Sequence, residues 1–90
     1  MRPSHLFAMD AVRLMESKTE ADISNTNEIV FSDVIDGIEI YHDESSVQEF
    51  IVNGITINVA GGGWARPIGG TASDTVIVPT GISFVLSRLE

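Results

Sequence analysis

The sequence contains no cysteine among its 90 residues. Disulfide frameworks, catalytic thiolates and cysteine-ligated zinc sites are therefore excluded. A long hydrophobic run is also missing: the longest uncharged stretch, residues 50–65, has 16 residues and is broken by glycines, whereas a membrane-spanning helix needs roughly 20 apolar residues. The apolar run at residues 6–9 is too short for the core of a signal peptide. We therefore expect a cytoplasmic protein with no membrane partner.

Positive charge is scarce. The chain has 5 Lys and Arg against 13 Asp and Glu, which gives a formal net charge of −8. The 47 residues between Lys18 and Arg66 contain no Lys or Arg and hold nine carboxylates. A surface this acidic repels nucleic acid and anionic membranes. The sequence therefore predicts no direct nucleic-acid binding, and its length predicts one domain with a thin core.

Few residues suit catalysis or metal binding. Residues 42–45 (His-Asp-Glu-Ser) hold a base, two carboxylates and a hydroxyl, but consecutive side chains at a strand end alternate in direction and do not converge as a relay. They also lack the spaced oxygen ligands and the glycine of a calcium loop. The glycines of residues 61–70 lack the Gly-Lys-Ser/Thr ending of a phosphate-binding loop. We expect no enzymatic activity, no metal and no cofactor.

Residues 4–18 have the pattern of an amphipathic helix. The segment contains no Gly or Pro, and Ser4 is a suitable N-cap. A broad apolar stripe at helical spacing consists of Phe7, Ala8, Ala11, Val12, Leu14 and Met15. Such a helix must bury one face, so we expect it to cover a sheet. The polar residues 19–27 form the predicted link to that sheet.

Six short segments rich in β-branched and aromatic residues follow the link. They are residues 28–34, 38–42, 47–52, 55–60, 75–78 and 82–86. The strongest local signal is Asn53-Gly54, which suits a type I′ hairpin turn and pairs Phe50 with Ile57. Residues 61–74 contain five glycines and are predicted to form a long irregular loop. The predicted fold class is α+β, with the N-terminal helix packed on an antiparallel meander of five to six strands in a single domain, residues 1–90.

The lengths of two turns, at Asp36-Gly37 and at residues 43–46, decide which carboxylates share a face of the predicted sheet. The sequence leaves open whether the first turn has two or three residues. If both turns use three residues, Glu39 lies opposite Glu49, and Asp33 lies opposite Glu39, on the exposed face. Like charges in these positions destabilise a sheet by up to about 1 kcal/mol. No Lys lies among these carboxylates to offset their charge. They therefore form either a solvated face or a surface that meets a basic partner.

The candidate partner-binding residues are the acidic and aromatic side chains near this face, together with two anchors in the glycine-rich loop. They are Asp33, Glu39, Tyr41, Asp43, Glu44, Glu49, Trp64 and Arg66. The carboxylates would meet Lys and Arg side chains of the partner, and Trp and Arg are enriched at interface hot spots. The alternative for the carboxylates is a solvated surface that keeps the domain in solution. The alternative for the loop is a flexible connection.

The size, the acidity, the absence of cysteine and the layout of a helix with a short meander resemble those of small phage-encoded anti-CRISPR proteins and other phage-type inhibitors. The resemblance implies a basic protein or nucleoprotein complex as partner, such as a CRISPR effector complex blocked at its DNA-binding or guide-binding step. The expected function is therefore an acidic inhibitor that occupies a nucleic-acid-binding surface. The alternative is a self-associating subunit that uses the C-terminal hairpin, residues 75–86, as an oligomer edge, so the protein would be a monomer or a homodimer.

Overall fold

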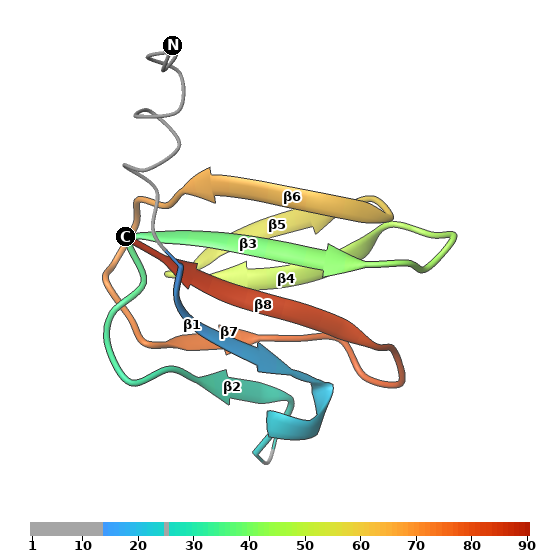
Figure 1. The fold of residues 1–90 in the computed structure, drawn as a ribbon, viewed down its shortest axis with the longest axis horizontal. Coiled ribbons are helices and arrows are strands. Elements are labelled where there is room, and N and C mark those ends of the chain that lie inside the picture. The colour runs from blue at the N-terminus through green and yellow to red at the C-terminus, as the bar shows by residue number, and fades with distance from the viewer. Residues whose placement is uncertain (1–13, 25) are drawn as a thin grey trace, which may run out of the picture.

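A computed structural model describes residues 14–24 and 26–90 of the chain. These residues form eight β-strands and one short 3₁₀ helix (Figure 1). The strands are β1 (Leu14–Thr19), β2 (Glu28–Val30), β3 (Gly37–His42), β4 (Gln48–Val52), β5 (Ile55–Val59), β6 (Gly62–Pro67), β7 (Thr75–Ile77) and β8 (Phe84–Leu89). The 3₁₀ helix, η1 (Glu20–Asp22), directly follows β1.

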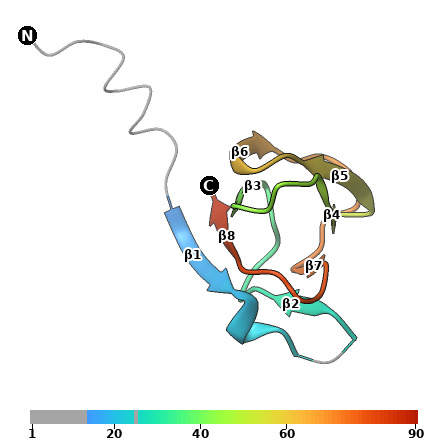
Figure 2. The same ribbon diagram turned by 90° about the vertical axis from the view of Figure 1, so that its right-hand side faces the viewer.

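The strands form two antiparallel sheets that face each other (Figure 2). Sheet A has the order β1-β8-β3-β6, and sheet B has the order β2-β7-β4-β5. The neighbouring strands are therefore β1 and β8, β2 and β7, β3 and β6, and β4 and β5. One long hairpin, with β4 and β5 at its tip, gives these pairs when it rolls up on itself. This is the jelly-roll arrangement, which occurs in capsid proteins, lectins and cupins and so does not by itself indicate a function.

The hairpin between β4 and β5 forms as the sequence predicts. Asn53 and Gly54 both have positive φ, at 53° and 77°, as a type I′ turn requires. Phe50 pairs with Ile57, and Val52 pairs with Ile55. Because this turn fixes the register within a few residues, the local sequence is enough to specify it.

The core lies between the two sheets and takes side chains from both. Strand β3 shows the alternation clearly, since Ile38, Ile40 and His42 are buried while Glu39 and Tyr41 are exposed. The rings of Phe50 in sheet B and Phe84 in sheet A meet edge to face, with centroids 5.7 Å apart. The other buried apolar side chains are Ile29, Phe31, Ile35, Val52, Ile57, Val59, Val76, Val78 and Leu86. Each large side chain buried in this way contributes about 1.5–3 kcal/mol.

The α+β prediction is wrong. The described residues contain no helix apart from η1, and residues 14–18 of the predicted helix lie in β1, while residues 4–13 lie outside the described part. Leu14 and Met15, which the helix was expected to bury, are 63% and 42% exposed. Strand β1 instead pairs with β8 from Leu14 to Thr19, with a break in the register between Leu14 and Glu16. Pairing between segments so distant in sequence outweighs the helical spacing of the apolar residues.

The predicted meander is also wrong beyond the β4–β5 hairpin. Strand β3 pairs with β8 and β6 and not with β4, which belongs to the other sheet. Strand β6 lies within the segment predicted to be an irregular loop. Its glycines Gly62 and Gly63 pair with His42 and Tyr41, and Trp64, opposite Ile40, packs against the core. The glycine content is typical of a loop, but the long-range pairing with β3 decides the structure.

Candidate protein-binding site

The face of sheet A that points away from the core is here called face A. The strand registers align its residues in three rows: Leu14, Leu89, Gly37 and Pro67; Ser17, Ser87, Glu39 and Ala65; and Thr19, Val85, Tyr41 and Gly63. Glu39 and Tyr41 are exposed there, with nearly half of the Tyr41 side chain open to solvent. Face A therefore combines small and apolar side chains with one carboxylate near its middle.

An acidic hollow of about 270 Å³ lies at the end of face A that carries η1. Two carboxylates, of Glu20 and Asp43, line it together with the ring of Tyr41, and Phe84 and Val85 complete the apolar part of the lining. Glu20 comes from η1 and Asp43 from the loop after β3, so the pairing of β1, β8 and β3 is what brings these groups together.

The backbone around Glu20 is held by local hydrogen bonds. The Thr19 hydroxyl accepts from the N–H of Ala21 at 3.3 Å, and the Asp22 carboxylate accepts from the N–H of Thr19 at 2.9 Å, which is a capping box. One oxygen of Glu20 accepts from the N–H of Phe84 at 3.1 Å. These contacts fix the Glu20 carboxylate at the hollow before any ligand arrives.

The arrangement suits a basic side chain. An arginine or lysine head group can pair with carboxylates through charge-assisted hydrogen bonds and can lie against an aromatic ring. The acidic hollow offers both kinds of contact. No Lys or Arg of residues 14–24 and 26–90 pairs with Glu20 or Asp43. A cation supplied by another molecule therefore has two carboxylates to neutralise.

The Lys and Arg side chains of the described residues contact groups other than Glu20 and Asp43. Lys18 Nζ lies 3.7 Å and Arg88 Nη2 lies 3.4 Å from the carboxylate of Glu16. The backbone N–H and the hydroxyl of Ser32 also donate to this carboxylate, and together with Arg88 and Lys18 they hold the pKa of Glu16 below its ordinary value of 4.5. The guanidinium of Arg66 lies over the Trp64 ring, 5.6 Å from its centroid.

The predicted row of carboxylates does not form. Glu39 lies on face A, but Glu49 lies opposite Asn58 on the outer side of sheet B, across the sandwich. Asp33 lies in the loop between β2 and β3, where its carboxylate accepts from the N–H of Val34 at 2.7 Å. The prediction failed because it assumed that β3 and β4 are neighbours in one sheet.

The other predicted site residues are divided between face A and its surroundings. Tyr41 and Asp43 line the acidic hollow. Glu44 follows Asp43 in the same loop, and its N–H donates to the His42 ring. Trp64 lies on β6, partly buried against the core, and does not lie in a loop. Glu20 was not among the predicted residues, although Thr19 and Asp22 have the spacing of a capping box, which marks the turn that positions it.

His42 is a core residue. It is fully buried, its Nε2 donates to the carbonyl of Val59 at 2.7 Å, and its Nδ1 accepts from the N–H of Glu44 at 3.1 Å. Both ring nitrogens are therefore used within the fold. Within the described part of the chain, no group of three or more His, Asp or Glu side chains is placed to hold a metal ion.

Comparison with known proteins gives no relative: no family model, no curated protein and no solved structure matches this chain. In the described residues, the structure has no helix with the length and apolar character needed to cross a membrane.

Proposed function

We propose that this protein is an acidic binding protein of the cytoplasm that occupies a basic, nucleic-acid-binding surface of a partner protein or nucleoprotein complex and thereby inhibits it. The observation that carries the proposal is the acidic hollow, where Glu20, Asp43 and the exposed ring of Tyr41 surround a space that would take a basic side chain. The pairing residues of a nucleic-acid-binding surface are Lys and Arg.

The distribution of charge supports this proposal. Acidic side chains lie on both sheets and in the loops between their strands, and the formal net charge of the chain is −8. The negative field of these charges accelerates encounter with a basic surface, while specific contacts fix the orientation. A CRISPR effector complex is one partner that has a basic, nucleic-acid-binding surface. The resemblance to anti-CRISPR proteins now concerns size, charge and the absence of cysteine, because the predicted helix-and-meander layout is wrong.

The C-terminal residues 75–86 do not form the hairpin that the alternative function requires. Strands β7 and β8 belong to different sheets and do not pair with each other. Each also has a neighbour on both sides, β2 and β4 for β7, and β1 and β3 for β8. We therefore do not propose self-association through residues 75–86, because the backbone groups that an edge would use are paired within the two sheets.

Affinity capture with charge-matched variants tests the proposed function. The protein is immobilised and exposed to host lysate at about 0.05 M and about 0.5 M salt, a range over which exposed charge pairs become screened. The test variant is Glu20→Gln with Asp43→Asn, and the control is Glu28→Gln with Glu49→Gln, which removes the same charge from sheet B.

The proposal expects a nucleic-acid-binding protein to be captured at low salt by the wild type and the control, and much less by the test variant. The purified partner should then release fluorescently labelled nucleic acid when the protein is added. Equal capture by both variants, or a captured partner that keeps its nucleic acid, would show that the proposed function is wrong.

A further inference from the structure

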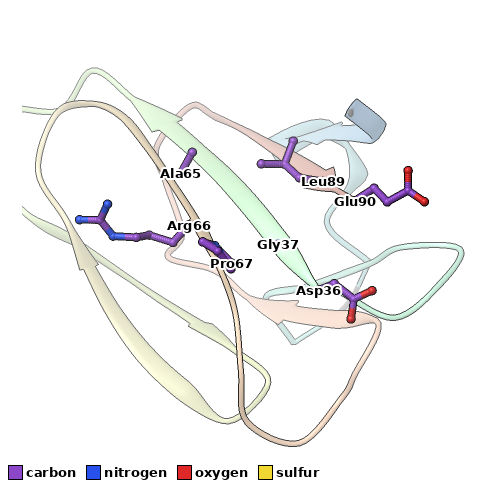
Figure 3. A pocket seen from close by; sticks show the side chains of 7 residues that line it. All are labelled: Asp36, Gly37, Ala65, Arg66, Pro67, Leu89 and Glu90. Atoms are coloured by element: carbon purple, nitrogen blue, oxygen red, sulfur yellow. The ribbon is translucent and has the colours of Figure 1, made fainter. Parts of the chain in front are cut away.

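A second hollow lies at the opposite end of face A, around Gly37. It has a volume of about 210 Å³, and its walls are formed by Ala65, Arg66, Pro67 and Leu89 (Figure 3). Asp36 and Glu90 lie at its rim. This apolar hollow is smaller than the roughly 300–1,000 Å³ of small-molecule sites, which indicates a site for a single side chain.

The hollow exists because residue 37 has no side chain. A Cβ at Gly37 would lie 3.4 Å from the carbonyl oxygen of Arg66 and 3.5 Å from the Cβ of Leu89, which is ordinary van der Waals contact. Gly37 also has no positive φ, so its backbone does not require glycine. A Cβ is therefore accommodated at this position, which lies in the lining of the hollow.

The two hollows are in line along β3. Gly37 is at the apolar hollow and Tyr41 is at the acidic hollow, four residues apart on one face of the strand. At about 3.3 Å per residue this separation is roughly 13 Å. In an extended segment, side chains i and i+4 point to the same side with the same separation. Side chain i+2 would then lie over Glu39, between the hollows.

We infer that face A binds an extended segment of the partner that carries a basic residue for the acidic hollow and an apolar residue four positions away for the apolar hollow. This inference rests on the proposed function and names the part of the partner that is recognised. A second basic residue, midway between the two, would meet Glu39.

Charge decides between this occupant and a second copy of the chain. Two copies joined through face A would bring together the carboxylates of Glu20, Asp36, Glu39 and Asp43 from each copy. The described cations offset only part of this repulsion, because Lys18 and Arg88 are paired with Glu16, which leaves Arg66 beside the apolar hollow. A basic segment, in contrast, meets complementary charge.

Fluorescently labelled peptides test the inference on the full chain by fluorescence anisotropy. The probes are Gly-Arg-Ser-Lys-Ser-Leu-Gly and its reverse, Gly-Leu-Ser-Lys-Ser-Arg-Gly, because the segment can run in either direction. At least one of them should bind, and replacing its Leu by Ser should weaken binding about tenfold or more, the effect of losing a buried leucine side chain.

The matched protein variant is Gly37→Leu, which fills the apolar hollow. It should bind the Leu and Ser forms of the peptide with equal affinity. Its affinity for both should still fall as the salt concentration rises, because the contact of the peptide Arg with the acidic hollow is unchanged. Comparison of the Leu and Ser peptides on the wild-type protein needs no variant, so the inference stays testable if Gly37→Leu does not fold.

The outcomes separate the two proposals. Equal affinity of the wild type for the Leu and Ser peptides, with Glu20→Gln and Asp43→Asn still abolishing capture of the partner, would overturn the inference and leave the proposed function standing. If Glu20→Gln with Asp43→Asn binds both the peptides and the partner as well as the wild type does, the inference and the proposed function are both wrong. A homodimer in light scattering that Gly37→Leu dissociates would also overturn the inference, because face A would then be occupied by a second copy.

Discussion

The side-chain amide of Asn53 donates a hydrogen bond to the carbonyl of Ile35, 18 residues earlier in the chain, at 2.9 Å. The same amide nitrogen donates to the carbonyl of Gly69 at 3.2 Å, and the amide oxygen accepts from the N–H of Ser73 at 3.0 Å. One nearly buried side chain at the β4–β5 turn thus joins the loop before β3 to the loop after β6.

Asn53→Ala should therefore be strongly destabilising. It leaves buried backbone groups without partners and places alanine at a φ of 53°, and we expect a loss of about 2–4 kcal/mol. Asn53→Gly loses the same hydrogen bonds but tolerates the backbone, so it should be more stable than Asn53→Ala by about 1 kcal/mol. Urea unfolding measures both. Equal stability of the two variants would show that the backbone conformation contributes nothing.

Gly61 and Gly63 form a matched pair of glycines with opposite expectations. A Cβ at Gly61 would lie 2.7 Å from the carbonyl oxygen of Glu44, whereas one at Gly63 would meet nothing within 4 Å. Gly61→Ala should cost about 1–3 kcal/mol because backbone must move. Gly63→Ala should change the free energy of unfolding by less than about 0.5 kcal/mol. Similar effects of the two substitutions in thermal unfolding would contradict the close approach of Gly61 and Glu44.

The stability of the fold should fall in acid through Glu16. Hydrogen bonds from Ser32, with help from Arg88 and Lys18, lower the pKa of this carboxyl in the folded state below 4.5. A carboxyl with a depressed folded pKa stabilises the protein above its unfolded pKa, and this contribution is lost as the pH falls through the folded value. The wild type should be more stable than Glu16→Gln near neutral pH, and the difference should shrink below about pH 4.5.

Urea titrations of the wild type, Glu16→Gln and the control Glu49→Gln over this pH range measure the effect. Glu49 is exposed on sheet B and has no ion pair with the described residues, so its variant should follow the wild type. A difference between wild type and Glu16→Gln that stays constant into acid would contradict the assignment.

His42→Phe should destabilise the protein without affecting partner binding. A phenyl ring fits the apolar surroundings, which include Phe50 at a centroid distance of 6.4 Å. The Val59 carbonyl and the Glu44 N–H, however, lose their partner. We expect a cost of about 2–4 kcal/mol in urea unfolding. A variant that stays folded but no longer binds the partner would instead give the imidazole a role in recognition.

Local signals in the sequence predicted the local parts of the structure. The Asn53-Gly54 turn, the pairing of Phe50 with Ile57 and the strand character of residues 38–42 are confirmed. Each of these features depends on residues close to one another in the chain. The sandwich itself depends on pairings such as Thr19 with Val85, which no local pattern encodes.

The same distinction holds for the candidate site. Tyr41 and Asp43 stood out in the sequence as exposed groups at a strand end, and they do line the acidic hollow. Glu20 did not, because its place beside them requires that β8 lies between β1 and β3. Glu49 was assigned to the same face because β3 and β4 are consecutive, although they belong to different sheets.

The rolled-up order of the strands also has a kinetic consequence. The β4–β5 hairpin is the one pairing of strands that are consecutive in the described chain, and a hairpin of this kind forms in about 1–10 μs. Sheet A, in contrast, joins residues as far apart as Leu14 and Leu89, and even its pair β3 and β6 joins segments that are not consecutive strands. Proteins dominated by such distant contacts fold in milliseconds to seconds. We therefore expect a slow refolding reaction in which β4 and β5 meet first and face A, with both of its hollows, is completed last.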